Sequence, residues 1–252
     1  MKRIFVISIL CLAVIAGSAY SAKKPKQPKP KKTKESQIVQ TVNPVTAESQ
    51  LKMGMMYLKG EQVKQNYGKA KKWFFKSAMA GNLQALENLG LLYKDGHGGW
   101  NYKKLFRQIE KNANAGNEQA FTNLGYLYRG GFGPKKGDYN QAVNWFRKSA
   151  DAGQASGMYY MGWMTYNGFG TTQDYNEAIG WYKKAADKGY ADAQYKLSQL
   201  YTESPAVAQD YVEAYKWLME AEKSGRDVFE DKYMLEKKMT AEQIAEAKNK
   251  AD

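Results

Sequence analysis

The sequence has very few cysteines and histidines, the residues that form disulfides and that often act in side-chain catalysis. It has one cysteine and one histidine in 252 residues. Cys11 lies near the amino terminus, so no disulfide can hold the rest of the chain together and no cysteine–histidine pair is available there. A zinc site needs several cysteine or histidine ligands at close spacing, and the sequence has no such cluster. We therefore expect a fold that is stabilised by packing alone, with no metal and no cofactor.

A long apolar run is also missing. The apolar stretch from Ile4 to Gly17 is shorter than the roughly 20 residues that a membrane-spanning helix needs. It follows Lys2 and Arg3 and precedes small residues, which is the three-part pattern of a secretory signal peptide. We predict a signal peptide over residues 1–21. The mature chain would then be exported, either to the periplasm of a Gram-negative cell or out of the cell.

Acidic residues are absent from the first 34 positions, which carry nine lysines and arginines. The net charge of the whole chain is +13, so everything from Glu35 onward carries 13 − 9 = +4. This mild balance does not favour a nucleic-acid partner. The segment Lys23–Lys34 interleaves lysine with proline, which predicts a disordered Lys/Pro-rich linker over residues 22–44. Its charge leaves open a weak contact with an anionic surface.

The rest of the chain repeats itself five times with a period of about 36 residues. One landmark is the small residue of a Leu/Met-Gly-x-x-Tyr block, and a second is a glycine near the end of each unit. The first falls at Gly54, Gly90, Gly125, Gly162 and Ser198, and the second at Gly81, Gly116, Gly153, Gly189 and Gly225. Two landmarks that keep one period are typical of a solenoid of stacked units.

Each unit divides into two amphipathic segments, and nothing in it is typical of a strand. Apolar residues stand at helical spacing from Ala120 to Tyr128 in a first segment and from Tyr175 to Ala185 in a second. We therefore predict an all-α fold, namely an α/α solenoid (superhelix) of five helix-turn-helix repeats over residues 45–226. C-terminal capping helices over residues 227–252 would close the exposed end of the core.

Local signals mark where the predicted helices begin and end. An acceptor side chain followed three residues later by Glu or Gln predicts a capping box at Asp138, Asp174, Asp210 and Thr240. The glycine near the end of each unit fits a left-handed helix terminator. Gly125, inside a first helix, is expected where the backbone of a second helix approaches too closely for a side chain.

The third unit shows the repeated residues most clearly. They are Leu124-Gly125-x-Leu127-Tyr128, Asp138-Tyr139-x-x-Ala142, Trp145-Phe146 and Ala152-Gly153. This pattern resembles the Sel1-like repeat, an α/α solenoid related to the tetratricopeptide repeats. The second unit departs from it, with Gln108 at the position of the tryptophan. The resemblance implies a scaffold for protein binding. Exported members act as adaptors, as host-interaction factors, and as immunity proteins that neutralise secreted antibacterial effectors such as a type VI secretion phospholipase.

Few residues suggest catalysis. His97 stands alone in a glycine-rich loop. Ser49 and Lys52 match the S-x-x-K of penicillin-recognising enzymes, but the S-D-N and K-T-G elements that accompany it in those enzymes are absent. We predict that the protein is not an enzyme and has no catalytic residue, with a β-lactam hydrolase and a cell-wall or glycan-binding module left as alternatives.

The inner side of the solenoid is the predicted binding surface. If Leu124 and Tyr128 face the core, then Thr122, Tyr126 and Arg129 fall on the open side of the same helix. This register, carried through the units, places large apolar and aromatic residues where polar ones are usual. The predicted partner-binding residues are Met55, Leu91, Tyr126, Arg129, Tyr159, Trp163, Tyr166 and Tyr195. Aromatic residues and arginine are enriched at binding hot spots. The competing interpretation is that superhelical curvature buries these side chains between units.

The sequence thus predicts an exported Sel1-like repeat protein that acts as a protein–protein interaction scaffold or adaptor through its concave surface. An immunity protein that neutralises a secreted antibacterial effector is the first alternative. Aromatic anchors indicate that a protein is bound without identifying it, so the partner stays unknown.

Overall fold

The structure, a computed structural model, describes residue 42 and residues 45–97, 102–130, 137–205 and 207–251. The signal peptide predicted over 1–21 lies outside the described residues, as does the linker over 22–44 except for Val42. Both stay predictions. Within the described ranges every regular element is a helix and there is no strand, which confirms the all-α fold.

The described residues form twelve helices. The first helices of the five units are α2 (Ala47–Lys59), α4 (Leu83–Lys94), α6 (Gln119–Arg129), α8 (Ala155–Asn167) and α10 (Ala191–Glu203). The second helices are α3 (Tyr67–Met79), α5 (Tyr102–Asn114), α7 (Tyr139–Asp151), α9 (Tyr175–Ala186) and α11 (Tyr211–Lys223). Two further helices follow, α12 (Phe229–Glu236) and α13 (Ala241–Ala251).

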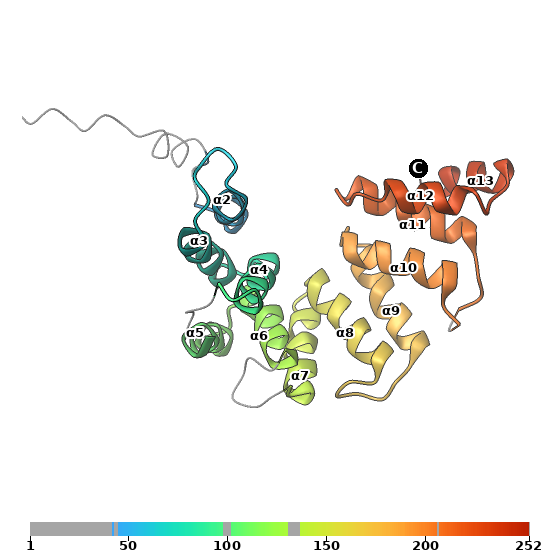
Figure 1. The fold of residues 1–252 in the computed structure, drawn as a ribbon. Coiled ribbons are helices and arrows are strands. Elements are labelled where there is room, and N and C mark those ends of the chain that lie inside the picture. The colour runs from blue at the N-terminus through green and yellow to red at the C-terminus, as the bar shows by residue number, and fades with distance from the viewer. Residues whose placement is uncertain (1–41, 43–44, 98–101, 131–136, 206, 252) are drawn as a thin grey trace, which may run out of the picture.

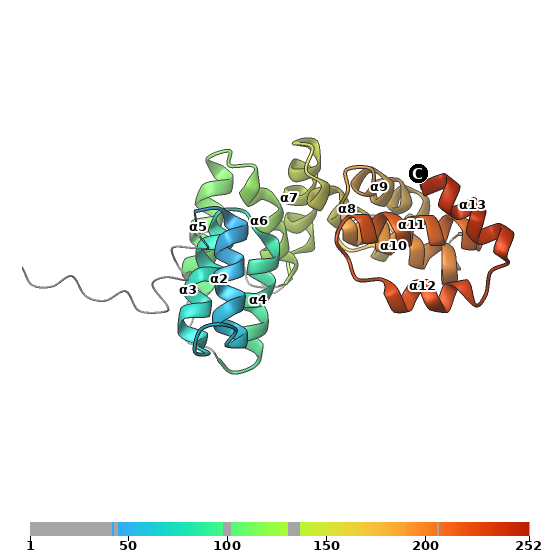
Figure 2. The same cartoon turned by 90° about the horizontal axis from the view of Figure 1, so that it is seen from above.

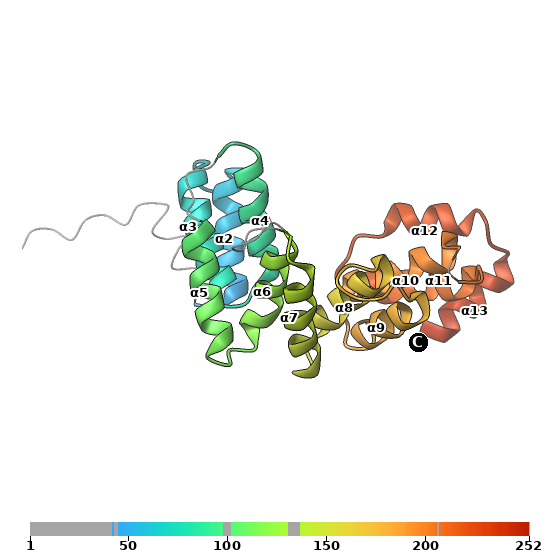
Figure 3. The same cartoon turned by 90° about the horizontal axis from the view of Figure 1, so that it is seen from below.

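The units stack side by side into an arc that is open on one side (Figure 1). The first helices lie next to one another, since α2 contacts α4, α4 contacts α6 and α6 contacts α8. The view from below shows α5, α7 and α9 along the outer side of the arc (Figure 3). The arrangement is the predicted α/α solenoid, with first helices on the inner side and second helices outside.

A glycine in the first helix makes room for an aromatic ring from the second. A Cβ atom on Gly125 would lie 2.6 Å from the Phe146 ring, which is fully buried. The same contact joins Gly54 to Phe74 and Gly162 to Tyr182. The predicted neighbour of Gly125, a helix backbone, was wrong, because a ring from the partner helix fills the space instead. These glycine–ring contacts fix how the two helices of a unit pack.

The fifth unit changes both partners of this contact together. Ser198 stands at the glycine position, and Leu218 stands at the position of the ring. A leucine side chain lacks the flat bulk of a ring, so a small side chain on the first helix is tolerated. The Ser198 hydroxyl donates to the carbonyl oxygen of Tyr195 at 2.9 Å, which satisfies it within its own helix.

The helix ends agree with most of the predicted signals. Gly153 has φ +79°, a left-handed conformation that an L side chain adopts at a cost. The Asp174 carboxylate accepts a hydrogen bond of 2.9 Å from the backbone amide of Glu177. Asp138 and Asp210 cap their helices in the same way, although the return bond of a full capping box is not present at these three aspartates. Thr240 and Gln243 form both bonds.

The C-terminal helices continue the stack in an altered way. Helix α13 packs on α11, as the first helix of a further unit would do. Helix α12 lies beside α10 and α11 when the open side of the arc is viewed from above (Figure 2). Val228, Leu235 and Ala247 are buried against the last helices of the stack and extend its core. Of the described helices, none has the length and apolarity to cross a bilayer.

Candidate functional site: the inner surface

The eight predicted partner-binding residues all lie on the first helices of the units, and none of them is fully buried. Leu91 on α4 is 56% exposed, and the other seven are half-buried. Most of the seven pack one side against the hydrophobic core and leave the other side accessible. Burial between units, the competing interpretation, therefore holds for part of each side chain only.

Arg129 is the centre of an aromatic cluster contributed by two units. Its guanidinium carbon lies 4.7 Å from the ring centre of Tyr126, 4.8 Å from that of Trp163 and 5.3 Å from that of Tyr160. A guanidinium over ring faces is attracted by the negative charge density of the rings. We call Arg129, Tyr126, Tyr160 and Trp163 the arginine cluster. The sequence predicted three of its members on one surface and made no prediction for Tyr160.

No carboxylate of the described residues lies within ion-pair distance of the Arg129 guanidinium, although other ion pairs form along the chain. An arginine that is half-buried and unpaired is unusual, because removing a cation from water costs free energy. The ring faces offset part of this cost. One of the guanidinium N–H donors is within reach of the Tyr126 hydroxyl, and the others have no carboxylate acceptor among the described residues.

Glu87 on α4 lies beside the arginine cluster. The Tyr160 hydroxyl donates a hydrogen bond of 3.2 Å to the Glu87 carboxylate. Burial raises the pKa of Glu87 above its ordinary value, the Tyr160 bond lowers it, and the nearby Asp192 raises it further. Arg129 opposes these increases only weakly. The predicted register placed Glu87 on the open side, but nothing in the sequence distinguished it from a solvated acid.

Tyr159 is the most enclosed of the predicted aromatic residues near the cluster. Its ring centre lies 5.2 Å from that of Tyr160, 5.4 Å from that of Tyr190 and 5.6 Å from that of Tyr182. Burial raises the pKa of the Tyr159 hydroxyl. The side chain thus remains a neutral hydrogen-bond donor, held in place by the rings on three sides.

Tyr195 marks the carboxyl-terminal end of the inner face, where its side chain joins α10 to α12. Its hydroxyl donates to the Asp231 carboxylate at 2.9 Å. The Arg226 guanidinium carbon lies 3.8 Å from the centre of the Tyr195 ring, and Arg226 also pairs with Asp192. The Tyr195 hydroxyl and the Arg226 guanidinium both have partners within the chain. Tyr195 therefore contributes chiefly to the attachment of α12.

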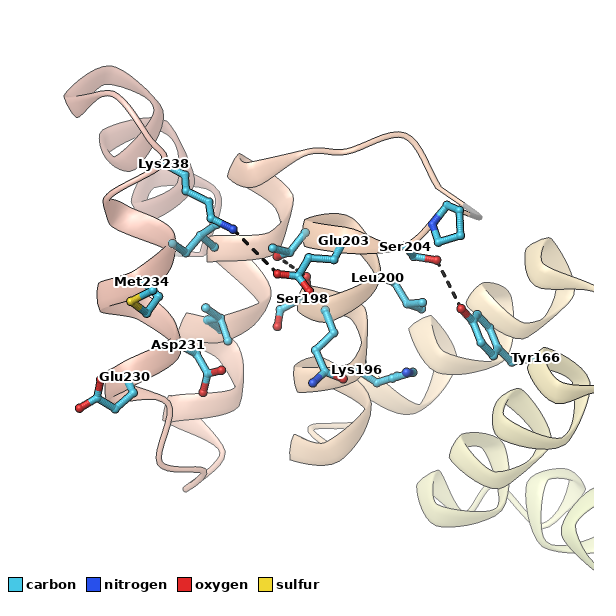
Figure 4. A pocket seen from close by; sticks show the side chains of 15 residues that line it. Tyr166, Lys196, Ser198, Leu200, Glu203, Ser204, Glu230, Asp231, Met234 and Lys238 are labelled. Carbon is cyan, nitrogen blue, oxygen red and sulfur yellow. Dashed lines mark hydrogen bonds and ion pairs between the residues drawn. The ribbon is translucent and has the colours of Figure 1, made fainter.

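A cavity of about 480 Å³ opens between α10, α12 and the loop after α10 (Figure 4). Tyr166 from α8 reaches its edge, where its hydroxyl lies 3.4 Å from that of Ser204. Lys238 pairs with Glu203 across the mouth at 3.8 Å. Its lining is mixed, with apolar Leu200, Leu218, Met234 and Leu235 beside charged Lys196, Glu230 and Asp231. The inner face thus ends in a hollow that helix α12 forms.

One position of the predicted register, Thr122, is buried. Thr122 was expected on the open side, and that was wrong because the side chain is 3% exposed. Its hydroxyl lies 2.6 Å from that of Ser149 on α7 and 2.9 Å from that of Ser156 on α8. The next unit covers this end of α6 because adjacent first helices are in contact.

Met55, the predicted residue nearest the amino terminus, lies on α2, at the far end of the arc from Tyr195.

The residues considered for catalysis have structural roles. The Ser49 hydroxyl donates to the carbonyl oxygen of Thr46 at 3.0 Å, and it accepts from the Thr46 amide at 3.1 Å. The His97 ring stacks on Tyr67 with centres 3.7 Å apart. Among the described residues, no group of three or more His, Cys, Asp or Glu side chains could hold a metal ion.

Comparison with known proteins places the repeats in a family. The sequence profile of the Sel1 repeat matches residues 47–82, 120–154, 155–190 and 191–225, which together make up more than half of the chain. The second unit is the one not matched, in agreement with its departure at Gln108. Among curated proteins of known function, no match was found.

Solved structures give a consistent result. A Sel1 repeat protein from Oxalobacter formigenes is 30% identical over 77% of this chain and 74% of its own, with a TM-score of 0.48. A protective antigen with the same repeat fold from uropathogenic Escherichia coli is 27% identical over 81% of this chain, which spans about half (52%) of that protein, with a TM-score of 0.44. An immunity protein from Pseudomonas aeruginosa is 16% identical over 73% of this chain and 71% of its own, with a TM-score of 0.50.

The last of these shares the fold alone, and the profile match carries the assignment. Three observations agree with one another. They are the four matched repeats, the glycine–ring contacts inside the units and the stacked arrangement of helix pairs. The chain belongs to the Sel1 repeat family.

Proposed function

We propose that this Sel1 repeat protein is an exported adaptor that holds a segment of another protein against its inner surface and performs no chemistry of its own. The arginine cluster carries the proposal. A cation and two half-buried rings, those of Tyr126 and Trp163, lie together beside the buried Tyr160 ring. Tyrosine, tryptophan and arginine are enriched among the few residues that dominate the binding energy of protein interfaces.

The shape of the inner surface suits an extended segment better than a small ligand. The predicted residues are spread over α2, α4, α6, α8 and α10, so contacts with all of them require a partner that follows the arc. Solenoids bind along such continuous surfaces. The cavity beside α12, with its mixed polar and apolar lining, would take the end of the segment.

Replacement of Trp163 by alanine tests the proposal. The matched control is Trp181→Ala, because Trp181 is also half-buried but lies on α9, a second helix. Both variants lose a tryptophan of similar exposure, so similar losses of stability are expected. Only Trp163→Ala should abolish capture of the native partner from an envelope fraction of the source cells. Equal capture by both variants, or equal loss, would exclude the inner surface as the binding site.

Export is a separate part of the proposal, supported by the charged, apolar and small-residue pattern of residues 1–21. Intact-mass measurement on protein recovered from its native cells tests it. The expected mass is that of a chain that starts close to residue 22. A mass that includes the first 21 residues would remove export from the proposal and leave the binding role in place.

An immunity protein is the narrower candidate. It is supported by the fold shared with the P. aeruginosa immunity protein, at a TM-score of 0.50. A chain of this kind should protect cells that express the matching effector, and the gene for that effector is expected beside its own. Protection that survives Trp163→Ala would separate this role from the arginine cluster.

A further inference from the structure

We infer that the arginine cluster recognises a carboxylate, supplied by an aspartate or glutamate side chain of the bound segment. The inference rests on the proposed function, because it names the chemistry that the inner surface selects. The carboxylate would meet the edge of the Arg129 guanidinium between the rings of Tyr126 and Trp163.

The chemistry of arginine favours a carboxylate as the acceptor. Three rings lie within cation–π distance of the Arg129 guanidinium and restrain the side chain. Arginine presents its donors as a planar fork that matches the two oxygens of a carboxylate. One donor is within reach of the Tyr126 hydroxyl, and the remaining ones have no carboxylate acceptor among the described residues.

The neighbouring charges favour a single negative charge over a double one. Glu87 lies close enough to Arg129 for each to affect the other, and Asp192 adds a second acid in the same region. A phosphate with two charges would be repelled by both acids. A carboxylate brings one charge, and the Glu87 carboxylate is already held by the Tyr160 hydroxyl at 3.2 Å.

One tyrosine hydroxyl adds a neutral donor beside the cluster. Burial raises the pKa of Tyr126, so its hydroxyl stays protonated at neutral pH and can donate to an acceptor without adding charge. The Tyr160 hydroxyl already donates its hydrogen to Glu87. The surface therefore combines one cation with a neutral donor and apolar rings, which matches a segment that carries an acidic residue between large apolar ones.

A random library of twelve-residue peptides displayed on phage, selected on the purified protein, tests the inference without knowledge of the partner. We expect aspartate and glutamate to be enriched in the selected peptides. Selection on Arg129→Gln should lose this enrichment. The matched control is Arg107→Gln, because Arg107 is an exposed arginine on α5 and its removal changes the net charge equally; its selected peptides should stay acidic.

A double-mutant cycle on one selected peptide measures the contact itself. Changing the acidic residue of the peptide to its amide should weaken binding about tenfold for the wild-type protein, as expected for a charged hydrogen-bonded pair. The same change should have little effect on Arg129→Gln. Arg129→Lys should give an intermediate effect, because the charge is kept and the fork is lost. Circular dichroism of each variant separates loss of binding from loss of fold.

The outcomes distinguish the inference from the proposed function. If the selected peptides show no acidic enrichment but their binding still depends on Trp163, the carboxylate inference is wrong and the proposed binding surface stands. A preference for phosphoserine over glutamate in the selected peptide would also show that the carboxylate inference is wrong. Peptides that bind the wild type and Trp163→Ala equally would overturn both.

Discussion

The Tyr160 hydroxyl on α8 donates a hydrogen bond of 3.2 Å to the Glu87 carboxylate on α4, so the fourth unit touches the second. In a straight stack, units that are two apart would not meet. Asn123 makes a similar connection, since its amide donates at 2.8 Å from α6 in the third unit to the Ala78 carbonyl oxygen on α3 in the first. Both bonds join units that are two apart, and the Tyr160 bond lies within the arginine cluster.

Replacement of Glu87 by glutamine should stabilise the protein at neutral pH. Burial raises the pKa of Glu87 above its ordinary value of 4.5, so the native state holds this proton more tightly than the unfolded chain does. The stabilisation from a raised pKa is complete below pH 4.5 and is lost as the pH rises through the native value. Glu87→Gln cannot lose a proton and can still accept the Tyr160 bond.

Melting temperatures measured from pH 4 to pH 8 check this prediction. Glu87→Gln should melt above the wild type at pH 7, and the difference should shrink toward pH 4. A variant that melts below the wild type at pH 7 would show that the ionised carboxylate stabilises the curvature.

Replacement of Gly125 by alanine should destabilise the third unit by about 1–3 kcal/mol, because overpacking forces the buried Phe146 ring to move. Gly180→Ala is the matched control. It lies inside α9 with no atom within 4 Å of an added Cβ, so it should stabilise by up to about 1 kcal/mol. Urea unfolding of both variants measures the contrast. Destabilisation by both would mean that glycine is needed for reasons other than the ring.

Replacement of Asn123 by leucine should cost about 1–3 kcal/mol, because the Ala78 carbonyl oxygen loses the donor that reaches it from another unit. Asn167→Leu provides the comparison. Its amide donates to the Trp163 carbonyl oxygen at 2.7 Å within a single helix, and its side chain is half-buried. The expected loss is smaller, and thermal unfolding of the two variants side by side is the measurement. A larger loss for Asn167→Leu would argue against a structural role for the long-range bond.

Replacement of Ser49 by alanine should lower stability by about 0.5–2 kcal/mol, since the hydroxyl takes part in the cap of α2. The same purified proteins can be assayed with a chromogenic β-lactam. We expect no turnover by the wild type, and hence no activity for the variant to lose. Turnover that disappears with Ser49→Ala would instead establish the hydrolase alternative.

The fold was predictable because every unit carries the same local signals. Gly125 marks a first helix, Asp138 caps a second helix and Gly153 ends it, and similar signals recur along the chain with one period. Local chemistry of this kind needs no knowledge of distant contacts. The position of α12 could not be predicted, because Phe229–Glu236 lies outside the period and its place depends on α10.

The candidate site was predictable in part. A fixed register identified Tyr126, Arg129 and Trp163 as inner-face residues, because helical spacing alone decides which side of a helix a residue takes. It could not show that their rings surround one cation, since that depends on curvature between units. For the same reason it missed Tyr160 and placed Thr122 on the wrong side.

The terminal helices limit where further repeats can be added to this protein. Because α13 occupies the surface of α11 on which another first helix would pack, the array has no open end on that side. Duplication of a repeat after Lys223 would have to displace both α12 and α13. Lengthening of the array is therefore expected by insertion of whole units between existing ones, where each new pair finds the same two faces to join.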